Sequence, residues 1–87
     1  MAERRITVTA AAGLHARPAA EFVRLASAYA GDVRVHAADR DPIDGASILG
    51  IMTLGVERGE SIVVSVVGAD DAEAMLERLA RILDPAG

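Results

Sequence analysis

A histidine and an arginine stand two residues apart, just before a stretch with helical character. His15 and Arg17 belong to the run Gly-Leu-His-Ala-Arg-Pro-Ala-Ala at residues 13–20, and the spacing of apolar side chains after it predicts a helix over 19–30. Pro18 suits the first turn of a helix, whose N–H groups lack partners within the helix. An imidazole there lies beside free N–H donors and a guanidinium, a setting suited to carrying a phosphoryl group.

Such a carrier needs a neutral ring nitrogen before transfer and a stabilised dianion afterwards. A helix N-terminus and Arg17 both disfavour a positive imidazole at His15, and both stabilise a phosphoryl dianion. The alternative is that His15 only caps the helix and Arg17 is only a solvated side chain. His36 stands in a strand pattern without a partner motif, so we expect no function for it.

Composition restricts the remaining classes of function. The 87 residues predict one domain over 1–87, and 52% of them are hydrophobic. The net charge of −4 argues against nucleic-acid binding, which needs a basic face. The chain has no cysteine, no apolar stretch long enough for a bilayer and no N-terminal signal core, so we expect a cytoplasmic protein. Neither the spacing of a metal site nor a cofactor motif is present, and we expect neither group.

Alternation and β-branched residues predict four strands, at residues 6–9, at 33–36, around Ile43 and at 61–67. Pro42 suggests an edge position for the third strand, because proline cannot donate to the ladder. A short helix follows Ser47, a good N-cap, and a final helix follows Asp70, with Glu73 completing a variant of the capping box. The order β-α-β-β-α-β-α predicts an α+β fold with helices on one face of an antiparallel sheet.

Two segments resemble one known family. Residues 13–20 resemble the active-site segment of the HPr family, the histidine phosphocarriers of the bacterial phosphotransferase system, and residues 46–55 resemble the region of its second helix. The resemblance covers nearly the whole chain. It implies an open-faced β-sandwich with strand order 1-4-2-3 and three helices on one side.

The resemblance also implies a role for particular residues. His15 accepts the phosphoryl group from phosphoenolpyruvate-charged enzyme I and passes it to EIIA components of sugar permeases, and Arg17 stabilises the group. The chain is then a phosphoryl carrier with a covalent phosphohistidine rather than a stand-alone catalyst. We expect partners to dock on small and apolar side chains, with burial in the core as the alternative for each: Ala16, Ala20, Ile48, Leu49 and Met52.

Ser47 has two interpretations. It is a suitable helix cap, and its segment resembles the regulatory segment of Gram-positive relatives, which a serine kinase/phosphorylase modifies. Those relatives usually have a basic residue where this chain has Ala46. Three alternatives to the sugar-uptake carrier remain. They are a nitrogen- or dihydroxyacetone-linked regulatory paralogue, a module that binds a transcription factor through the Ser47 face, and an α+β domain without phosphoryl chemistry.

Overall fold

The computed structural model describes residues 2–11, 13–14, 16–37, 40–68 and 71–85, which form four strands and three helices. The elements in chain order are β1 (Ala2–Thr7), α1 (Ala16–Ala28), β2 (Gly31–Ala37), β3 (Ile43–Asp44), α2 (Ile48–Thr53), β4 (Ser61–Gly68) and α3 (Ala72–Leu83). The predicted order β-α-β-β-α-β-α is therefore confirmed.

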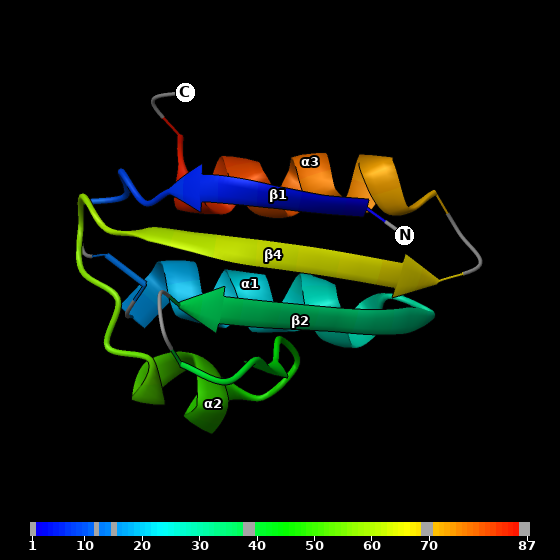
Figure 1. Ribbon diagram of the computed structural model, residues 1–87, viewed down its shortest axis with the longest axis horizontal. Coiled ribbons are helices and arrows are strands. Elements are labelled where there is room, and N and C mark those ends of the chain that lie inside the picture. Colours follow the sequence, from blue (N-terminus) through cyan, green and yellow to red (C-terminus); the bar gives the residue numbers. More distant parts are fainter. Residues whose placement is uncertain (1, 12, 15, 38–39, 69–70, 86–87) are drawn as a thin grey trace.

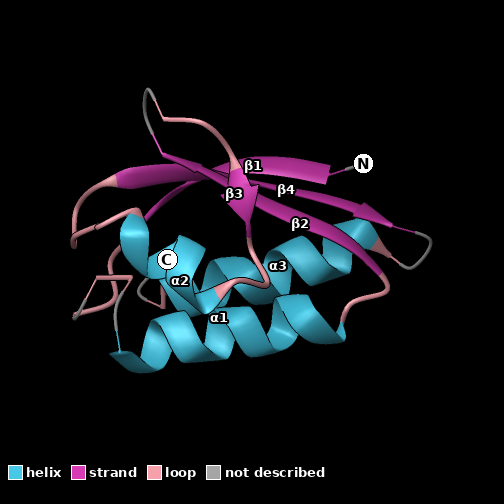
Figure 2. Cartoon of the chain, turned by 90° about the horizontal axis from the view of Figure 1, so that it is seen from below, coloured by secondary structure: helices cyan, strands magenta, loops and turns pink. Residues whose placement is uncertain are grey.

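The strands form one antiparallel sheet in the order β1-β4-β2-β3. The helices lie in a second layer against one face of the sheet, and the other face is open (Figures 1 and 2). Both features agree with the fold that the resemblance implies. Pro42 directly precedes β3, which is an edge strand, as its missing N–H predicts.

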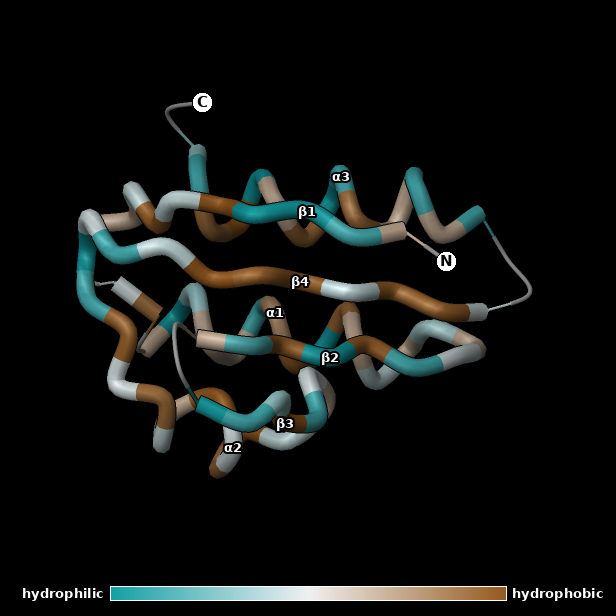
Figure 3. The backbone as a smooth tube through the Cα atoms, in the orientation of Figure 1, coloured by the Kyte–Doolittle hydropathy of each residue, from teal (hydrophilic) through white to brown (hydrophobic). Residues whose placement is uncertain are grey.

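Strand β4 lies in the middle of the sheet because its side chains are the most consistently apolar (Figure 3). Ile62, Val64 and Val66 alternate toward the helices and are all almost completely buried. Val64 pairs with Arg4 on β1 and with Val35 on β2, so it lies at the centre of the register. Every buried side chain in the described residues is apolar.

The predicted first strand, residues 6–9, is displaced from the observed one, Ala2–Thr7. A run of charged residues at 3–5 concealed the start of β1. Arg4 lies on the same side of the strand as buried Ala2 and Ile6, and it avoids burial by reaching Glu77 on α3 at 3.1 Å. Edge position thus permits a charge where a central strand would require an apolar side chain.

The predicted boundaries of the first helix are also wrong at both ends, because α1 spans Ala16–Ala28 rather than 19–30. Its buried face consists of Ala19, Phe22 and Ala26, which the helical spacing predicts. Ala30, the last residue of the predicted helix, is exposed and lies beyond the end of the observed one.

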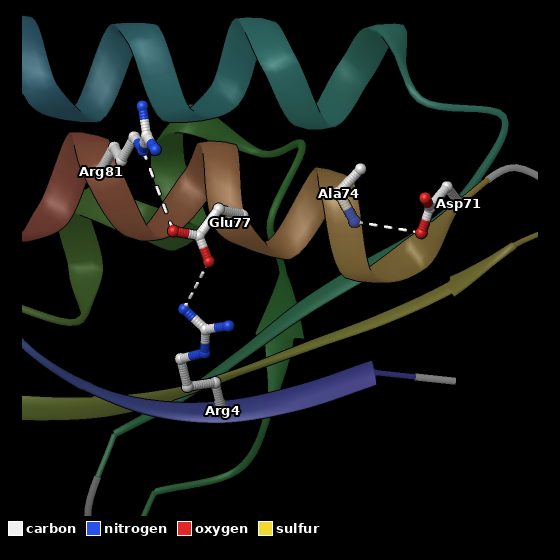
Figure 4. A network of polar contacts seen from close by, with 5 residues as sticks. All are labelled: Arg4, Asp71, Ala74, Glu77 and Arg81. Atoms are coloured by element: carbon white, nitrogen blue, oxygen red, sulfur yellow. Dashed lines mark hydrogen bonds and ion pairs between the residues drawn. The ribbon is translucent and has the colours of Figure 1, made fainter.

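The last helix, α3, is capped one residue later than predicted. Asp71 is the N-cap, and its Oδ1 accepts a hydrogen bond from the Ala74 N–H at 3.1 Å (Figure 4). The predicted capping box of Asp70 and Glu73 is therefore wrong, although Glu73 still complements the dipole in the first turn. Figure 4 also shows Glu77 between Arg4 on β1 and Arg81 on the same helix, at 3.1 and 3.8 Å.

Candidate functional site

The backbone leading to His15 is fixed by its neighbour Leu14. His15 itself lies outside the described residues. The Leu14 side chain is completely buried, and its N–H donates to the carbonyl oxygen of Val56 at 3.0 Å. The Gly13 N–H donates to the Ala10 carbonyl oxygen at 2.9 Å. The segment is therefore anchored to the core one residue before the predicted phosphoryl acceptor.

Gly13 is required by the close approach of a second loop. Its φ of +66° lies in the left-handed region, which side chains with a Cβ rarely adopt. A Cβ at this position would lie 2.8 Å from the carbonyl oxygen of Val56, 3.0 Å from Cα of Glu57 and 3.1 Å from the nitrogen of Arg58. All three are backbone atoms, so the contact cannot be relieved by turning a side chain. The loop over residues 55–60 thus supports the segment before His15.

Ala16 begins α1 with an unusual backbone conformation. Its φ of 51° is the only positive value at a non-glycine residue in the described part of the chain. Left-handed backbone costs an alanine roughly 1–2 kcal/mol, and such strain persists only where the surroundings enforce it. Here Leu14 and Ala19 are buried on either side, while Ala16 and Arg17 between them stay exposed. The sharp turn at Ala16 allows Leu14 and Ala19 to be buried while Ala16 and Arg17 remain exposed.

Arg17 is exposed in the first turn of α1. Within the described residues its guanidinium forms no hydrogen bond or ion pair. It lines a shallow groove on the outer face of α1 together with Ala20, Glu21 and Arg24. Pro18 follows in the same turn, where its missing N–H removes no helical hydrogen bond. The remaining N–H groups of this turn and Arg17 can therefore both face an anion.

Helix α2 presents an apolar surface to solvent. Ile48, Leu49 and Met52 are 42%, 78% and 48% exposed, whereas Ile51 is buried against the core. The alternative that these three side chains are buried in the core is therefore wrong. Figures 1 and 2 place α2 beside the N-terminal half of α1, which carries the exposed Ala16 and Ala20. We call the five exposed residues the apolar patch: Ala16, Ala20, Ile48, Leu49 and Met52.

Each end of α2 is satisfied by a side chain from outside the helix. Ser47 is the N-cap, and its Oγ accepts a hydrogen bond from the Gly50 N–H at 3.1 Å, as predicted. At the other end, Nη1 of Arg40 donates to the carbonyl oxygens of Thr53 and Leu54, each at 3.2 Å. No local pattern in the sequence predicts the Arg40 contact, because β3 and α2 lie between this residue and the carbonyls that it reaches.

The described residues contain neither a metal site nor a membrane-spanning helix. Among the described residues, no three His, Cys, Asp or Glu side chains gather as a metal site would require. None of the helices in these residues has the length and apolar character to cross a bilayer. His36 is half-buried on β2, beside Val63 of β4.

Comparisons with known proteins identify the family of the chain. The family model described as "PTS HPr component phosphorylation site" matches residues 2–84. The chain is 49% identical to the phosphocarrier protein HPr of Streptomyces coelicolor, over 95% of this chain and 88% of the relative.

Two solved structures illustrate the range of similar folds. The crystal structure of an HPr from Thermoanaerobacter tengcongensis has a TM-score of 0.87 and 38% identity, over 97% of this chain and 92% of that one. The solution structure of Crh, the catabolite repression HPr of Bacillus subtilis, has a TM-score of 0.66 and 32% identity, over 94% of this chain and 95% of that one. On the family model and these similarities, the chain belongs to the HPr phosphocarrier family of the phosphotransferase system.

Proposed function

We propose that the chain accepts a phosphoryl group on His15 from phosphoenolpyruvate-charged enzyme I and passes it to EIIA components for sugar uptake. The observation that carries this proposal is the state of Arg17. Its guanidinium is exposed, has no partner in the described residues and stands two positions after His15 at the N-terminal end of α1. An unengaged guanidinium can bind two phosphoryl oxygens at once, without first breaking an ion pair.

The transfer needs only groups that this chain supplies or exchanges with its partners. A bond forms between a His15 ring nitrogen and phosphorus as the bond from phosphorus to enzyme I breaks. Arg17 and the free N–H groups of the first turn of α1 bind the phosphoryl oxygens and stabilise their negative charge. The reverse exchange at EIIA restores the unmodified imidazole. The chain is thus both product and substrate of its partners' reactions.

The apolar patch fits the two encounters that this role requires. A carrier must bind enzyme I, dissociate and bind EIIA, so each complex has to be weak and short-lived. A small surface of exposed apolar side chains next to the N-terminal end of α1 provides contact area without a deep pocket. Methionine in the patch, at Met52, adapts to partners of different shape.

Intact-mass measurement tests the proposal directly. Incubation with enzyme I and phosphoenolpyruvate should add one phosphoryl group, and subsequent addition of EIIA should remove it. The modification should be labile in acid and stable in alkali, as phosphohistidine is. Absence of any mass gain would contradict the proposal. A product that phosphorylates only nitrogen-linked or dihydroxyacetone-linked acceptors would instead assign the chain to a regulatory branch.

Replacing the most exposed residue of the apolar patch should weaken docking without affecting the fold. Leu49 is 78% exposed, so Leu49→Asp should change the free energy of unfolding by less than about 0.5 kcal/mol. A charge that must be desolvated in the complex should raise KM for the carrier about tenfold in the enzyme I reaction, with kcat little changed.

Val67 offers a matched control for this substitution. It is an exposed apolar residue on β4, 47% accessible, and lines a hollow with residues of the open sheet face. Val67→Asp should leave KM near the wild-type value. An equal rise of KM in both variants would place docking elsewhere.

A second candidate function, regulation through phosphorylation of Ser47, is supported by the position of that side chain. Ser47 directly precedes Ile48 of the apolar patch and caps α2. A phosphate there would accept hydrogen bonds from the N–H groups of the first turn of α2. It would also place nearly two negative charges at the edge of the apolar patch. The similarity to Crh, whose name refers to catabolite repression, is consistent with a regulatory role. We expect a serine kinase/phosphorylase to modify Ser47 and a transcription factor to bind the modified form.

Ser47→Asp and Ser47→Asn separate charge from capping. Aspartate and asparagine are equally good N-caps, so both variants should retain α2. Only aspartate adds charge, so Ser47→Asp should raise KM for the carrier in the enzyme I reaction by about three- to tenfold, and Ser47→Asn should not. Enzyme kinetics with both variants provides the measurement. If Ser47→Asp is phosphorylated as readily as Ser47→Asn, the inhibitory effect of charge at this position is refuted.

A further inference from the structure

Helix α2 is too short to be stable in isolation. It spans Ile48–Thr53, and isolated helices below about 12 residues are marginal in water. Ile51 is its only buried residue, while Leu54 is buried just after its end. The remaining side chains of the helix face outward or lie half-buried. What keeps α2 in place must therefore include contacts at its two ends.

The C-terminal end of α2 is held by Arg40. The Nη1 atom donates to the carbonyl oxygens of Thr53 and Leu54, both at 3.2 Å, and these are among the carbonyls that a helix end leaves without partners. A positive charge at this end also complements the helix dipole. Arg40 is itself tied to the end of β2, because its backbone N–H donates to the carbonyl oxygen of Ala37 at 2.8 Å. The side chain thus links α2 to the sheet.

We propose that Arg40 is a positioning residue, which holds α2 and its part of the apolar patch in the orientation that partners bind. The proposal rests on the proposed function for its kinetic consequence. Its structural half, that Arg40 restrains α2 in the free protein, stands independently. Met52 lies in the turn that Arg40 caps, so loosening this turn displaces an exposed patch residue.

The geometry identifies two informative substitutions. Arg40→Met retains much of the apolar stem and removes the donor and the charge. Arg40→Lys retains a donor and the positive charge. Because both hydrogen bonds originate from the single nitrogen Nη1, one ammonium group can form them in its place. Arg78→Met is the charge control: Arg78 is exposed on α3 and has no hydrogen bond or ion pair in the described residues.

Hydrogen exchange in the free protein measures the restraint. The amides of Leu54 and Gly55 donate to carbonyls within α2, so they report opening of its last turn. We expect exchange of these amides to be about tenfold faster in Arg40→Met and near wild type in Arg40→Lys and Arg78→Met. Unchanged exchange in Arg40→Met would overturn the proposal.

Kinetics with enzyme I measure the consequence. Arg40→Met should raise KM for the carrier about three- to tenfold with kcat retained, and Arg40→Lys should restore it. A raised KM without faster exchange would mean that Arg40 touches the partner directly, which contradicts a positioning role. Faster exchange with an unchanged KM would show that docking does not need the restraint and would overturn the functional half. If the wild-type chain accepts no phosphoryl group, the proposed function fails, and hydrogen exchange still decides whether Arg40 holds α2.

Discussion

Replacing His15 with alanine should abolish phosphorylation by enzyme I and phosphoenolpyruvate. The substitution removes the only nucleophile that the sequence places at the N-terminal end of α1, where Arg17 is exposed and has no partner among the described residues. We expect no mass gain on prolonged incubation, while circular dichroism and Tm remain close to wild type. The fold should be retained because Leu14, on the preceding position, carries the buried contacts and the hydrogen bond to Val56.

His36→Ala is the matched control, since it removes the other histidine of the chain. It should be phosphorylated at the wild-type rate, because His36 alternates with buried Val33 and Val35 on β2 and so belongs to the open face of the sheet, opposite the helices. Arg17→Ala should lie between the two: slower transfer, by about 10- to 100-fold, with a Tm unchanged because the side chain is exposed. Continued labelling of His15→Ala would refute the assignment of the acceptor.

Gly13→Ala should be the most destabilising single-methyl substitution in the segment before His15. The left-handed φ of +66° costs alanine roughly 1–2 kcal/mol, and the new Cβ would collide with the backbone of Val56 and Glu57 at 2.8 and 3.0 Å. Forced overpacking typically adds about 1–3 kcal/mol. We therefore expect a loss of about 2–5 kcal/mol in the free energy of unfolding, and a Tm lower by about 10–40 °C.

Gly55→Ala provides a control matched in backbone conformation. Its φ is +62°, yet a Cβ there would meet no atom within 4 Å. This variant should lose only the conformational part, roughly 1–2 kcal/mol. Urea unfolding of the two variants separates strain from collision. Equal losses would show that the loop over residues 55–60 does not press on Gly13, and the account of how the segment is supported would be wrong.

Local signals in the sequence predicted much of the site. Ser47 is recognisable as a cap because a helix N-cap needs only a short hydrogen-bonding side chain and the N–H groups of the next turn. Pro42 marks an edge strand for an equally local reason. Leu49 could be predicted as exposed because consecutive residues of a helix face different directions.

Other features depend on contacts that sequence patterns do not encode. Arg40 reaches carbonyls 13 and 14 positions further along the chain, and nothing in the intervening residues indicates that the loop returns there. Arg4 meets Glu77 because β1 lies next to α3. The sequence does not reveal this contact, and the charge of Arg4 taken alone argues against a place in a strand. Boundaries failed where tertiary contacts override local preference: α1 starts at Ala16, in spite of its left-handed φ, because Leu14 and Ala19 are both buried.

The interior formed by the described residues is wholly apolar, and this bears on how partners distinguish the phosphorylated chain from the free one. A buried ionisable or hydrogen-bonding group is one route by which a new charge can rearrange a core, because unscreened interactions there are strong. Here the described core contains no such group, so a dianion gained at the surface has nothing inside to act upon. The loaded and unloaded forms should therefore share one backbone fold. Partners would then distinguish them by the charge at the N-terminal end of α1 and by the position of the Arg17 side chain.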